Sequence, residues 1–368
     1  RGLGDVYKRQ DYGDGMPFFQ GNADFGERYP ITRVWCNTPT KIAQAEDILI
    51  SVRAPIGALN YAKEECCIGR GLAAITPDRN KVSQDFIYWA LKGKKAELND
   101  KGNGSTFKAI SRKILEQTMI PDINFEQQHK CAENLEKIYG IIQNRRKELL
   151  ALDDLIKARF VEMFGSIHES TKYPYIAVKD LTDVISGGTP SRDRSEYWYN
   201  GTIPWVKTTE LQNNVIKNVD EHITESGLAG SSAKMVPIGT VLVAMYGQGK
   251  TRGMTAYLGI EASTNQACAC ILPSEKIDSM FMWKYFELSY DKLRSLAQGA
   301  GQPNLNGNMI KNFQVLVPPI ELQKEFVSFV EQVDKSKVAV QKALDETQTL
   351  FDSLMQEYFG LSLIHISE

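Results

Sequence analysis

A glycine-rich, basic loop at residues 246–253 (YGQGKTRG) holds the side chains best suited to bind a polyanion. Its Gly-Lys-Thr run imitates the end of a phosphate-binding P-loop, but that motif needs an earlier glycine where this sequence has Ala244, which excludes a P-loop. DNA suits the loop better, because glycines let a backbone approach closely, Lys250 and Arg252 can reach phosphates or guanine, and Gln248 can pair with adenine. We predict DNA contacts from Tyr246, Gln248, Lys250, Thr251 and Arg252, with a solvated hairpin loop as the alternative.

Further polar side chains follow strands or glycine turns at matching places in the two halves of the chain. The run at residues 187–192 (GGTPSR) is foremost a structural turn, and Arg192 and Arg194 are second candidates for phosphate contacts. The further candidates for DNA contact are Gln20, Asn22, Arg53, Arg70, Arg192, Arg194, Lys207 and Thr208. We expect Trp198, Trp205 and Trp283 in the core rather than as platforms for stacked bases.

The sequence offers no catalytic or metal-binding constellation. Adenine methyltransferases hold a flipped base with a short acidic or Asn-Pro-Pro-aromatic loop, and the nearest segment, residues 317–320 (VPPI), lacks the polar residue and the aromatic ring. The cysteines and histidines show no zinc-ligand spacing. We therefore expect a non-catalytic chain with no metal or cofactor of its own.

The elements that must position these residues occur twice. Residues 120–128 (IPDINFEQQ) recur as 317–323 (VPPIELQ), and the endings EMFG at 162–165 and EYFG at 357–360 lie 195 residues apart (165 to 360). A period of this length indicates a duplicated unit of domain size rather than a solenoid of short repeats. Two similar but non-identical readers suggest a target with two sites.

Two strand patterns and one amphipathic helix recur in each globular half. The strands are rich in β-branched and apolar residues, and Ser83 and Asp278 are placed to cap the helices. The matched segments are 47–52 with 240–245, 71–77 with 267–273, and 85–91 with 280–286. The second half also opens with residues 176–203, most of which have no counterpart in the first half, so we expect the first half to lack an opening strand and turn.

Two long helices complete the repeat. Alternating steps of three and four residues from Leu135 to Met163, and from Val330 to Tyr358, meet mostly apolar side chains, which predicts a coiled-coil seam on each helix. The seam residues expected to pack together or to dock partners are Leu135, Ile138, Ile142, Leu149, Leu152, Ile156, Val330, Val333, Val340, Leu344, Phe351 and Leu354. Arg145, Lys337 and Thr347 interrupt the seams and either set the register or reach solvent.

Short connections require the two helices to be antiparallel, with the globular halves at opposite ends. A helix of about 40 residues is about 60 Å long. That length lies between one turn of duplex DNA, about 34 Å, and two turns. Two readers mounted in this way can face one side of a duplex.

Composition and charge bound the class of protein. The 368 residues suit two domains, and the net charge of −2 excludes a basic coat over the whole surface, so any DNA-binding surface must be local. Six cysteines without a secreted pattern indicate reduced thiols of a cytoplasmic protein. No apolar run approaches the ~18 residues of a membrane span.

We divide the chain into six segments. Residues 1–10 and 361–368 continue neither repeat and look like non-native tails. The globular segments are 11–120 and 172–316, and the helical segments are 121–171 and 317–360.

The order of these motifs resembles that of the specificity (S) subunits of type I restriction-modification systems. The resemblance is carried in the second half by residues 186–191 (SGGTPS), 196–198 (EYW) and 201–207 (GTIPWVK), and in the first half by 15–21 (GMPFFQG), 69–71 (GRG) and 104–106 (GST). It covers residues 11–360 and implies an α+β fold with two similar mixed α/β target-recognition domains at opposite ends of two long antiparallel coiled-coil helices. The first half departs from the family pattern because it lacks the Gly-Gly-Thr-Pro turn.

The resemblance also implies a division of labour. Each target-recognition domain reads one half of a bipartite sequence in double-stranded DNA, and the helices fix the spacing and dock methyltransferase (M) subunits. A restriction/translocase (R) subunit joins for cleavage, and S-adenosylmethionine, ATP and Mg²⁺ belong to these partners. The alternatives are a coiled-coil scaffold that binds proteins without reading DNA, and a nuclease or methyltransferase in its own right, for which the sequence has no motif.

Overall fold

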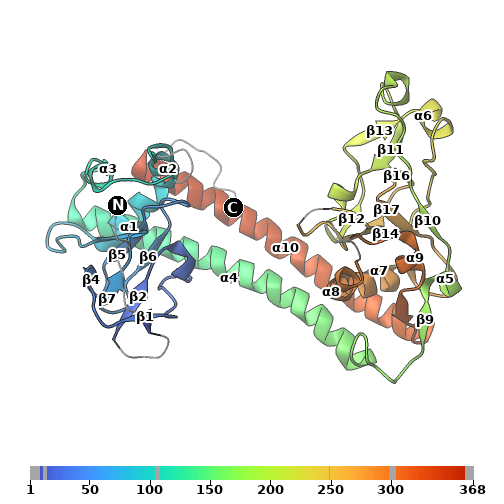
Figure 1. Ribbon diagram of the computed structural model, residues 1–368, viewed down its shortest axis with the longest axis horizontal. Coiled ribbons are helices and arrows are strands. Elements are labelled where there is room, and N and C mark those ends of the chain that lie inside the picture. Colours follow the sequence, from blue (N-terminus) through green and yellow to red (C-terminus); the bar gives the residue numbers. More distant parts are fainter. Residues whose placement is uncertain (1–8, 11–14, 104–107, 248, 298–303, 361–368) are drawn as a thin grey trace. The chain divides into compact units, whose positions relative to one another are not determined.

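The computed structural model describes residues 9–10, 15–103, 108–247, 249–297 and 304–360 (Figure 1). The chain divides into two compact units. Unit 1 comprises Arg1–Lys147 and Gln341–Glu368, and unit 2 comprises Glu148–Val340. The long helices α4 (Phe125–Phe164) and α10 (Ile320–Phe359) both cross this division, so each unit holds about half of each helix. The sequence predictions that lie outside the described residues are Gln248, the motif at 104–106 and most of the two tails.

The described part of unit 1 is a mixed structure of short strands and short helices. Its strands are β1 (Arg9–Gln10), β2 (Met16–Phe19), β3 (Trp35–Cys36), β4 (Ile42–Ala43), β5 (Ile48–Ser51), β6 (Leu59–Tyr61), β7 (Cys66–Ile68) and β8 (Leu72–Ile75). Its helices besides the long ones are η1 (Asn22–Asp24), α1 (Gln84–Gly93), α2 (Lys95–Asp100) and α3 (Arg112–Glu116). The strands form one sheet in the order β1-β3-β2-β7-β4 and another in the order β6-β5-β8.

Unit 2 repeats this plan with additional elements at its start. Its strands are β9 (Tyr175–Ala177), β10 (Val184–Ser186), β11 (Ile203–Val206), β12 (Asn214–Ile216), β13 (Glu221–Ile223), β14 (Val241–Ala244), β15 (Thr255–Leu258), β16 (Ser263–Thr264), β17 (Cys268–Ile271) and β18 (Gln314–Leu316). Its shorter helices are α5 (Val178–Leu181), η2 (Ser195–Tyr197), η3 (Thr208–Glu210), α6 (Glu225–Ala229), α7 (Ser279–Leu288), α8 (Tyr290–Ser295) and α9 (Gly307–Lys311). The sheets have the orders β10-β17-β14-β15-β12, β13-β11-β16 and β18-β9.

The predicted internal duplication is confirmed element by element. β5 and β14 are the predicted buried strands, β8 and β17 are their antiparallel partners, and α1 and α7 are the predicted helices. Ser83 and Asp278 cap these two helices as expected, because their side chains accept hydrogen bonds from backbone amides of the first turn. In unit 2 β17 also pairs with β10, whereas among the described residues of unit 1 β8 pairs only with β5.

A buried glutamine ties each of these helices to the start of a long helix. Gln128 accepts a hydrogen bond from the backbone amide of Ser83 at 2.8 Å and donates one to the carbonyl oxygen of Ile123 at 2.8 Å. Gln323 makes the equivalent bonds to Asp278 at 2.9 Å and Pro318 at 2.7 Å. Because both side chains are buried and bonded at both ends, they fix the position of each N-cap relative to its long helix.

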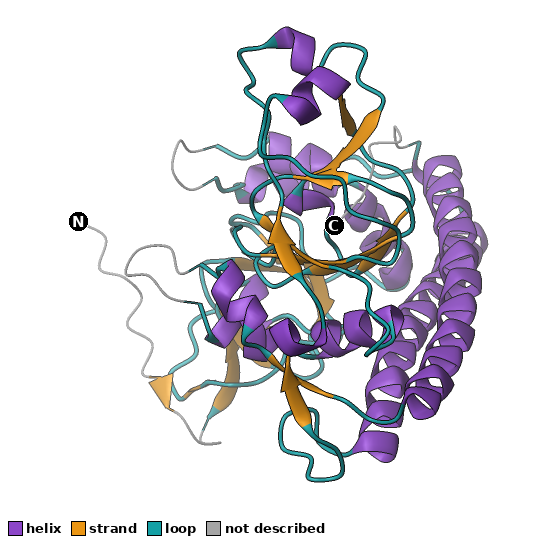
Figure 2. Ribbon diagram, turned by 90° about the vertical axis from the view of Figure 1, so that its right-hand side faces the viewer, coloured by secondary structure: helices purple, strands orange, loops and turns teal. Residues whose placement is uncertain are grey.

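Within each unit the halves of α4 and α10 lie side by side (Figure 2). In unit 1 Asn134 bonds to Tyr358 at 3.2 Å, and in unit 2 Arg159 bonds to Glu325 at 2.9 Å, so early residues of one helix meet late residues of the other. The pairing within each unit is therefore antiparallel, as predicted. Of the predicted seam residues, the buried ones are Leu135, Ile142, Ile156, Val330, Val333, Val340, Leu344 and Phe351, and the half-buried ones are Ile138, Leu149, Leu152 and Leu354.

The predicted seam is wrong near the end of both helices. After Ile156 the buried positions are Phe160 and Phe164 instead of Arg159 and Met163, and after Phe351 they are Met355 and Phe359 instead of Leu354 and Tyr358. Two successive steps of four rotate the apolar stripe, because here each helix also packs beneath α1 or α7. None of the helices in the described ranges is long and apolar enough to cross a membrane.

Candidate nucleic-acid interface

The basic loop of unit 2 is a hairpin connection between β14 and β15. The backbone amide of Gly253 bonds to the carbonyl oxygen of Ala244 at 2.9 Å, and Ala244 bonds in turn to Met254 at 2.9 Å. Gly247 and Gly253 have φ angles of 148° and 86°, which side-chain-bearing residues rarely adopt. The turn therefore depends on glycine, and the Lys250 side chain is exposed at its tip.

Helix α8 holds this loop from one side. Tyr290 Oη donates to the carbonyl oxygen of Lys250 at 2.7 Å, and Arg294 Nη1 donates to the carbonyl oxygen of Arg252 at 2.8 Å and to Tyr290 Oη at 3.1 Å. These bonds fix the backbone on both sides of Thr251. Tyr290 and Arg294 could not be predicted from the sequence, because they lie about 40 residues from the loop and no local pattern links them to it.

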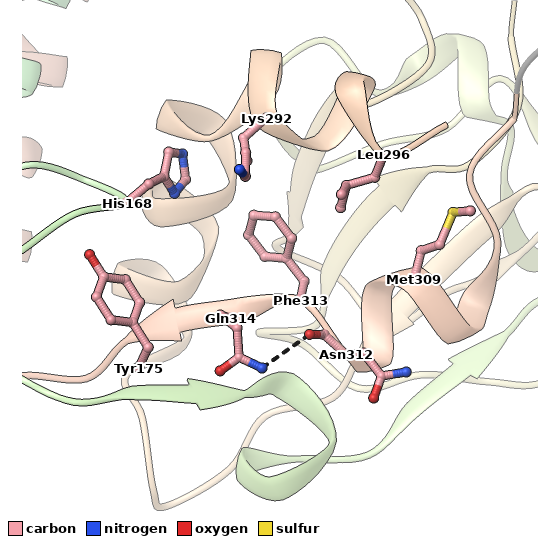
Figure 3. Close-up of a pocket in the computed structure, with 8 residues that line it drawn as sticks. All are labelled: His168, Tyr175, Lys292, Leu296, Met309, Asn312, Phe313 and Gln314. Carbon is pink, nitrogen blue, oxygen red and sulfur yellow. Dashed lines mark hydrogen bonds between the residues drawn. The ribbon is translucent and has the colours of Figure 1, made fainter. Parts of the chain in front are cut away.

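The opposite side of α8 faces a pocket of about 500 Å³ in unit 2 (Figure 3). Lys292 and Leu296 contribute to its wall, opposite Tyr175 and the strand that begins at Gln314. Burial, and then the nearby Lys292 charge, lower the pKa of His168. Residues at i and i+2 of a helix point in different directions, so the pocket and the loop use separate faces of α8.

Arg294→Ala is expected to loosen the loop at residues 249–254. The substitution removes two hydrogen bonds from a charged donor, which corresponds to about 1.5–3 kcal/mol each. Hydrogen exchange of the loop amides in the intact chain, measured by mass spectrometry, should accelerate. Lys292→Ala is the matched control, because this exposed side chain lies on the other face of the same helix. Equal acceleration in both variants would show that α8 as a whole, and not Arg294, controls the loop.

The other predicted basic residues of unit 2 are paired within the structure. Arg192 Nη1 bonds to Glu221 at 2.6 Å, and its guanidinium lies 3.6 Å from the ring centroid of Trp198. Lys207 Nζ lies 3.1 Å from the same carboxylate and 3.4 Å from Asp220. The hydrogen bond from Arg192, with a further contribution from Lys207, lowers the pKa of Glu221. Glu221, whose charge offsets part of this basic cluster, was not among the residues predicted from the sequence.

Arg194 and Thr208 are placed differently from the loop residues. Arg194 Nη1 bonds to Tyr197 Oη at 2.6 Å, which anchors it beside η2. Thr208 begins η3 and is half-buried. The described contacts do not bring Arg194 to the basic loop.

The Gly-Gly-Thr-Pro turn is a packing feature, as the sequence suggested. Trp205 Nε1 donates to the carbonyl oxygen of Gly188 at 3.0 Å, and the Gly188 amide donates to the carbonyl oxygen of Thr264 at 2.8 Å. A Cβ atom on Gly187 would overlap Thr264. Trp205 and Trp283 are buried core residues, as predicted, and Trp198 packs edge-on against Trp205.

In each unit one turn forms backbone hydrogen bonds to two separate places, the end of one strand and the loop that follows a second strand. In unit 1 the Gly69 amide bonds to Phe19 at 2.8 Å and the Val52 amide bonds to Gly71 at 2.9 Å. The turn therefore brings Arg70 beside Gln20 and next to Arg53. All three side chains are exposed, while Asn22 is half-buried.

Unit 2 repeats this pair of bonds. The Asn265 amide bonds to Val206 at 3.0 Å, and the Met245 amide bonds to Ala267 at 2.8 Å. The residues that follow Val206 and Met245 are Lys207 and Tyr246, so the strand end and the basic loop meet at the turn of residues 265–267. The same backbone geometry thus gathers candidate DNA contacts in both units, although the candidates were scattered in sequence.

The described ranges contain no group of three or more His, Cys, Asp or Glu side chains arranged to hold a metal ion. The gathered groups are instead amides, hydroxyls, guanidiniums and amines, which are the donors that proteins use for phosphates and base edges.

Known proteins are similar to this chain in sequence and in fold. The family model for the type I restriction modification DNA specificity domain matches residues 33–152 and 170–347. A putative type I restriction enzyme MjaX specificity subunit of Methanocaldococcus jannaschii is 44% identical over 136 residues, which are 37% of this chain and 32% of that protein. The MjaIX specificity subunit of the same organism is 22% identical over 349 residues, covering 90% of this chain and 80% of that protein.

The chain thus spans about a third of the first relative and four-fifths of the second. A crystal structure of the S subunit of a type I restriction-modification system from M. genitalium has the same fold, with a TM-score of 0.58 at 15% identity and 99% of both chains covered. Because the family model matches two segments that make up most of the sequence, one in each repeat, this chain belongs to the type I restriction modification DNA specificity family.

Proposed function

We propose that this chain is the DNA-reading specificity subunit of a type I restriction-modification complex, in which each unit reads one half of a bipartite target. The observation that carries the proposal is the repeated pair of backbone hydrogen bonds around residues 69–71 and 265–267. This geometry gathers exposed polar side chains at one place in each unit, and an internal duplication suits a target that has two parts.

The two units would read DNA with different side chains. In unit 2 Lys250, Thr251 and Arg252, together with Tyr246, would contact phosphates and bases from the glycine loop. In unit 1 Arg53, Arg70 and Gln20 would do so, with Asn22 beside them. Lys207 and Arg192 would approach DNA only with Glu221 between them, so they would contribute less net charge than their number suggests.

The chain would act without catalysis of its own. M subunits would dock on the two long helices and supply S-adenosylmethionine-dependent methylation, and an R subunit would supply ATP- and Mg²⁺-dependent translocation and cleavage. The complex would work in the cytoplasm, which suits the six cysteines, all free thiols in the structure.

The test is to map N6-methyladenine in cells that express this chain with the M subunit encoded beside it. Single-molecule sequencing should detect one two-part motif with a fixed gap. Lys250→Ala should relax or abolish one half of that motif and leave the other half intact. Loss of both halves together would contradict separate readers.

A scaffold that binds proteins without DNA is the second reading, and the net charge of −2 is the observation in its favour. Salt dependence separates the two. A DNA reader that neutralises phosphates loses affinity steeply as salt rises, because counterions are released on binding. If the purified complex shows no DNA affinity at low salt, the scaffold stands and the specificity role fails.

A further inference from the structure

Helices α1 and α7, here called the docking helices, rest on the long helices through a shared frame. Phe86 of α1 packs against Phe359 with ring centroids 5.3 Å apart, and Phe281 of α7 packs against Phe164 at 5.6 Å. The buried glutamine bonds described above are also the same in both units. We call the surface of α4 and α10 that receives a docking helix its dock. The shared contacts orient both docking helices in the same way, so they do not distinguish the dock of unit 1 from the dock of unit 2.

Beside the frame, unit 1 fills its dock with aromatic rings. Trp89 of α1 is fully buried, with its ring centroid 5.3 Å from Tyr139 of α4 and 5.6 Å from Phe351 of α10. Lys92, one turn later on α1, places its Nζ 3.7 Å from the centroid of the Tyr139 ring. Edge-to-face rings and a cation over an aromatic face both depend on these residue types.

Unit 2 fills the equivalent positions with charges. The residues that lie 195 positions after Trp89, Lys92 and Tyr139 are Lys284, Glu287 and Asp334. Lys284 is only 3% exposed, and its Nζ lies 3.0 Å from Glu287 and 3.7 Å from Asp334. A lysine that is this deeply buried needs its carboxylates, because an unpaired buried charge is strongly destabilising.

The charge network of unit 2 continues onto both long helices. Lys337 of α10 lies 3.7 Å from Asp334 and 2.5 Å from Asp153 of α4. The position in unit 1 that corresponds to Lys337 is Ile142, which is buried and apolar. The residue that corresponds to Phe351 in the other dock is Ile156, which leaves less aromatic surface for an indole ring.

We infer that these two residue sets make each dock specific for its own globular part. The aromatic set is Trp89, Lys92, Tyr139 and Phe351, and the ionic set is Lys284, Glu287, Asp153, Asp334 and Lys337. If α1 were placed on the dock of unit 2, Trp89 would press onto the Asp334 carboxylate. If α7 were placed on the dock of unit 1, Lys284 would be buried against Tyr139 and Phe351 without Asp334. The sets therefore fix which reader occupies which position, within one chain and against exchange with a second copy.

The inference goes beyond the proposed function, and its test needs no DNA or partner subunit. The first variant is Lys284→Trp in the full chain. It places a tryptophan in α7 at the position that Trp89 has in α1. The second variant is the triple Lys284→Trp, Glu287→Lys and Asp334→Tyr, which transfers three of the four residues of the aromatic set and leaves Ile156 in the place of Phe351. Lys335→Trp, an exposed lysine of α10, is the control for the bulk of the new ring.

Hydrogen exchange of α7, resolved by mass spectrometry, is the measurement, and α1 in the same molecule is the internal reference. Lys284→Trp should accelerate exchange in α7 by roughly 100-fold, because it leaves two carboxylates beside a buried ring, and should leave α1 unchanged. The triple variant should recover most of the protection, and Lys335→Trp should match the parent chain. The inference would be overturned if Lys284→Trp exchanged like the parent chain. It would also be overturned if α7 were as unprotected in the triple variant as in Lys284→Trp, and this comparison holds even if Lys284→Trp alone fails to fold.

Discussion

Gly187→Ala is expected to destabilise unit 2 by about 3 kcal/mol, at the upper end of the cost of overpacking a closed site. The added methyl group would overlap Thr264 Oγ1 and the carbonyl oxygens of Thr264 and Asn265. Those backbone atoms cannot move freely, because Thr264 accepts the Gly188 amide and Asn265 bonds to Val206. The strain would therefore pass directly to the turn that joins the strand end to the basic loop.

The measurement is the unfolding of the intact chain, monitored by hydrogen exchange of the peptides of each unit separately. Unit 2 should lose protection and unit 1 should keep it. Gly307→Ala is the matched control, because a Cβ there meets nothing closer than 3.9 Å and the residue lies in the first turn of α9. We expect the control to change stability by less than about 0.5 kcal/mol. If Gly187→Ala unfolds no more readily than the control, the turn does not support unit 2.

The duplication could be predicted from sequence because its signals are local. Buried strands, helix caps and the long helices each leave a pattern within a short window, and Ser83 and Asp278 cap the helices as that pattern required. The antiparallel pairing followed from the short connections alone. These features need no knowledge of which distant residues meet.

The candidate DNA contacts stay a prediction, and the sequence did not indicate the charges that surround them. Glu221 begins β13, whereas Lys207 follows the end of β11 and Arg192 lies 29 residues away, yet Glu221 bonds to both. A count of basic residues therefore overstates the free positive charge of this surface. The supports of the loop, Tyr290 and Arg294, were missed for the same reason, since only the fold brings α8 against residues 250–252.

The coiled-coil seam shows where periodicity itself is insufficient. The three-four spacing is correct in the middle of both helices, where Ile142, Ile156, Val340 and Leu344 are buried as expected. Near Phe164 and Phe359 each helix must also cover a docking helix, so the buried face widens and shifts. A heptad pattern predicts the face of a helix that packs against one other helix, and it does not predict the additional face that packs against the globular part.

A matched insertion of seven residues in both long helices is expected to lengthen the gap between the two half-sites and to leave their sequences unchanged. The insertions would follow Lys147 in α4 and Val340 in α10, where the two units divide. Seven residues preserve the heptad phase of the seam, so both units keep their own packing. Both helices would grow by about 10 Å.

A base pair rises about 3.4 Å, so the gap should grow by about one to three base pairs, with the larger value applying if the helices run along the duplex. Methylation mapping would read the new gap directly. The same insertion in α4 alone should instead abolish methylation, because the pairs of unit 1, such as Tyr139 with Phe351, and those of unit 2, such as Asp153 with Lys337, could no longer be in register at the same time. An intact, active complex with an unchanged gap after the paired insertion would show that the length of the helices does not set the spacing, and that the spacing is determined by the partner subunits.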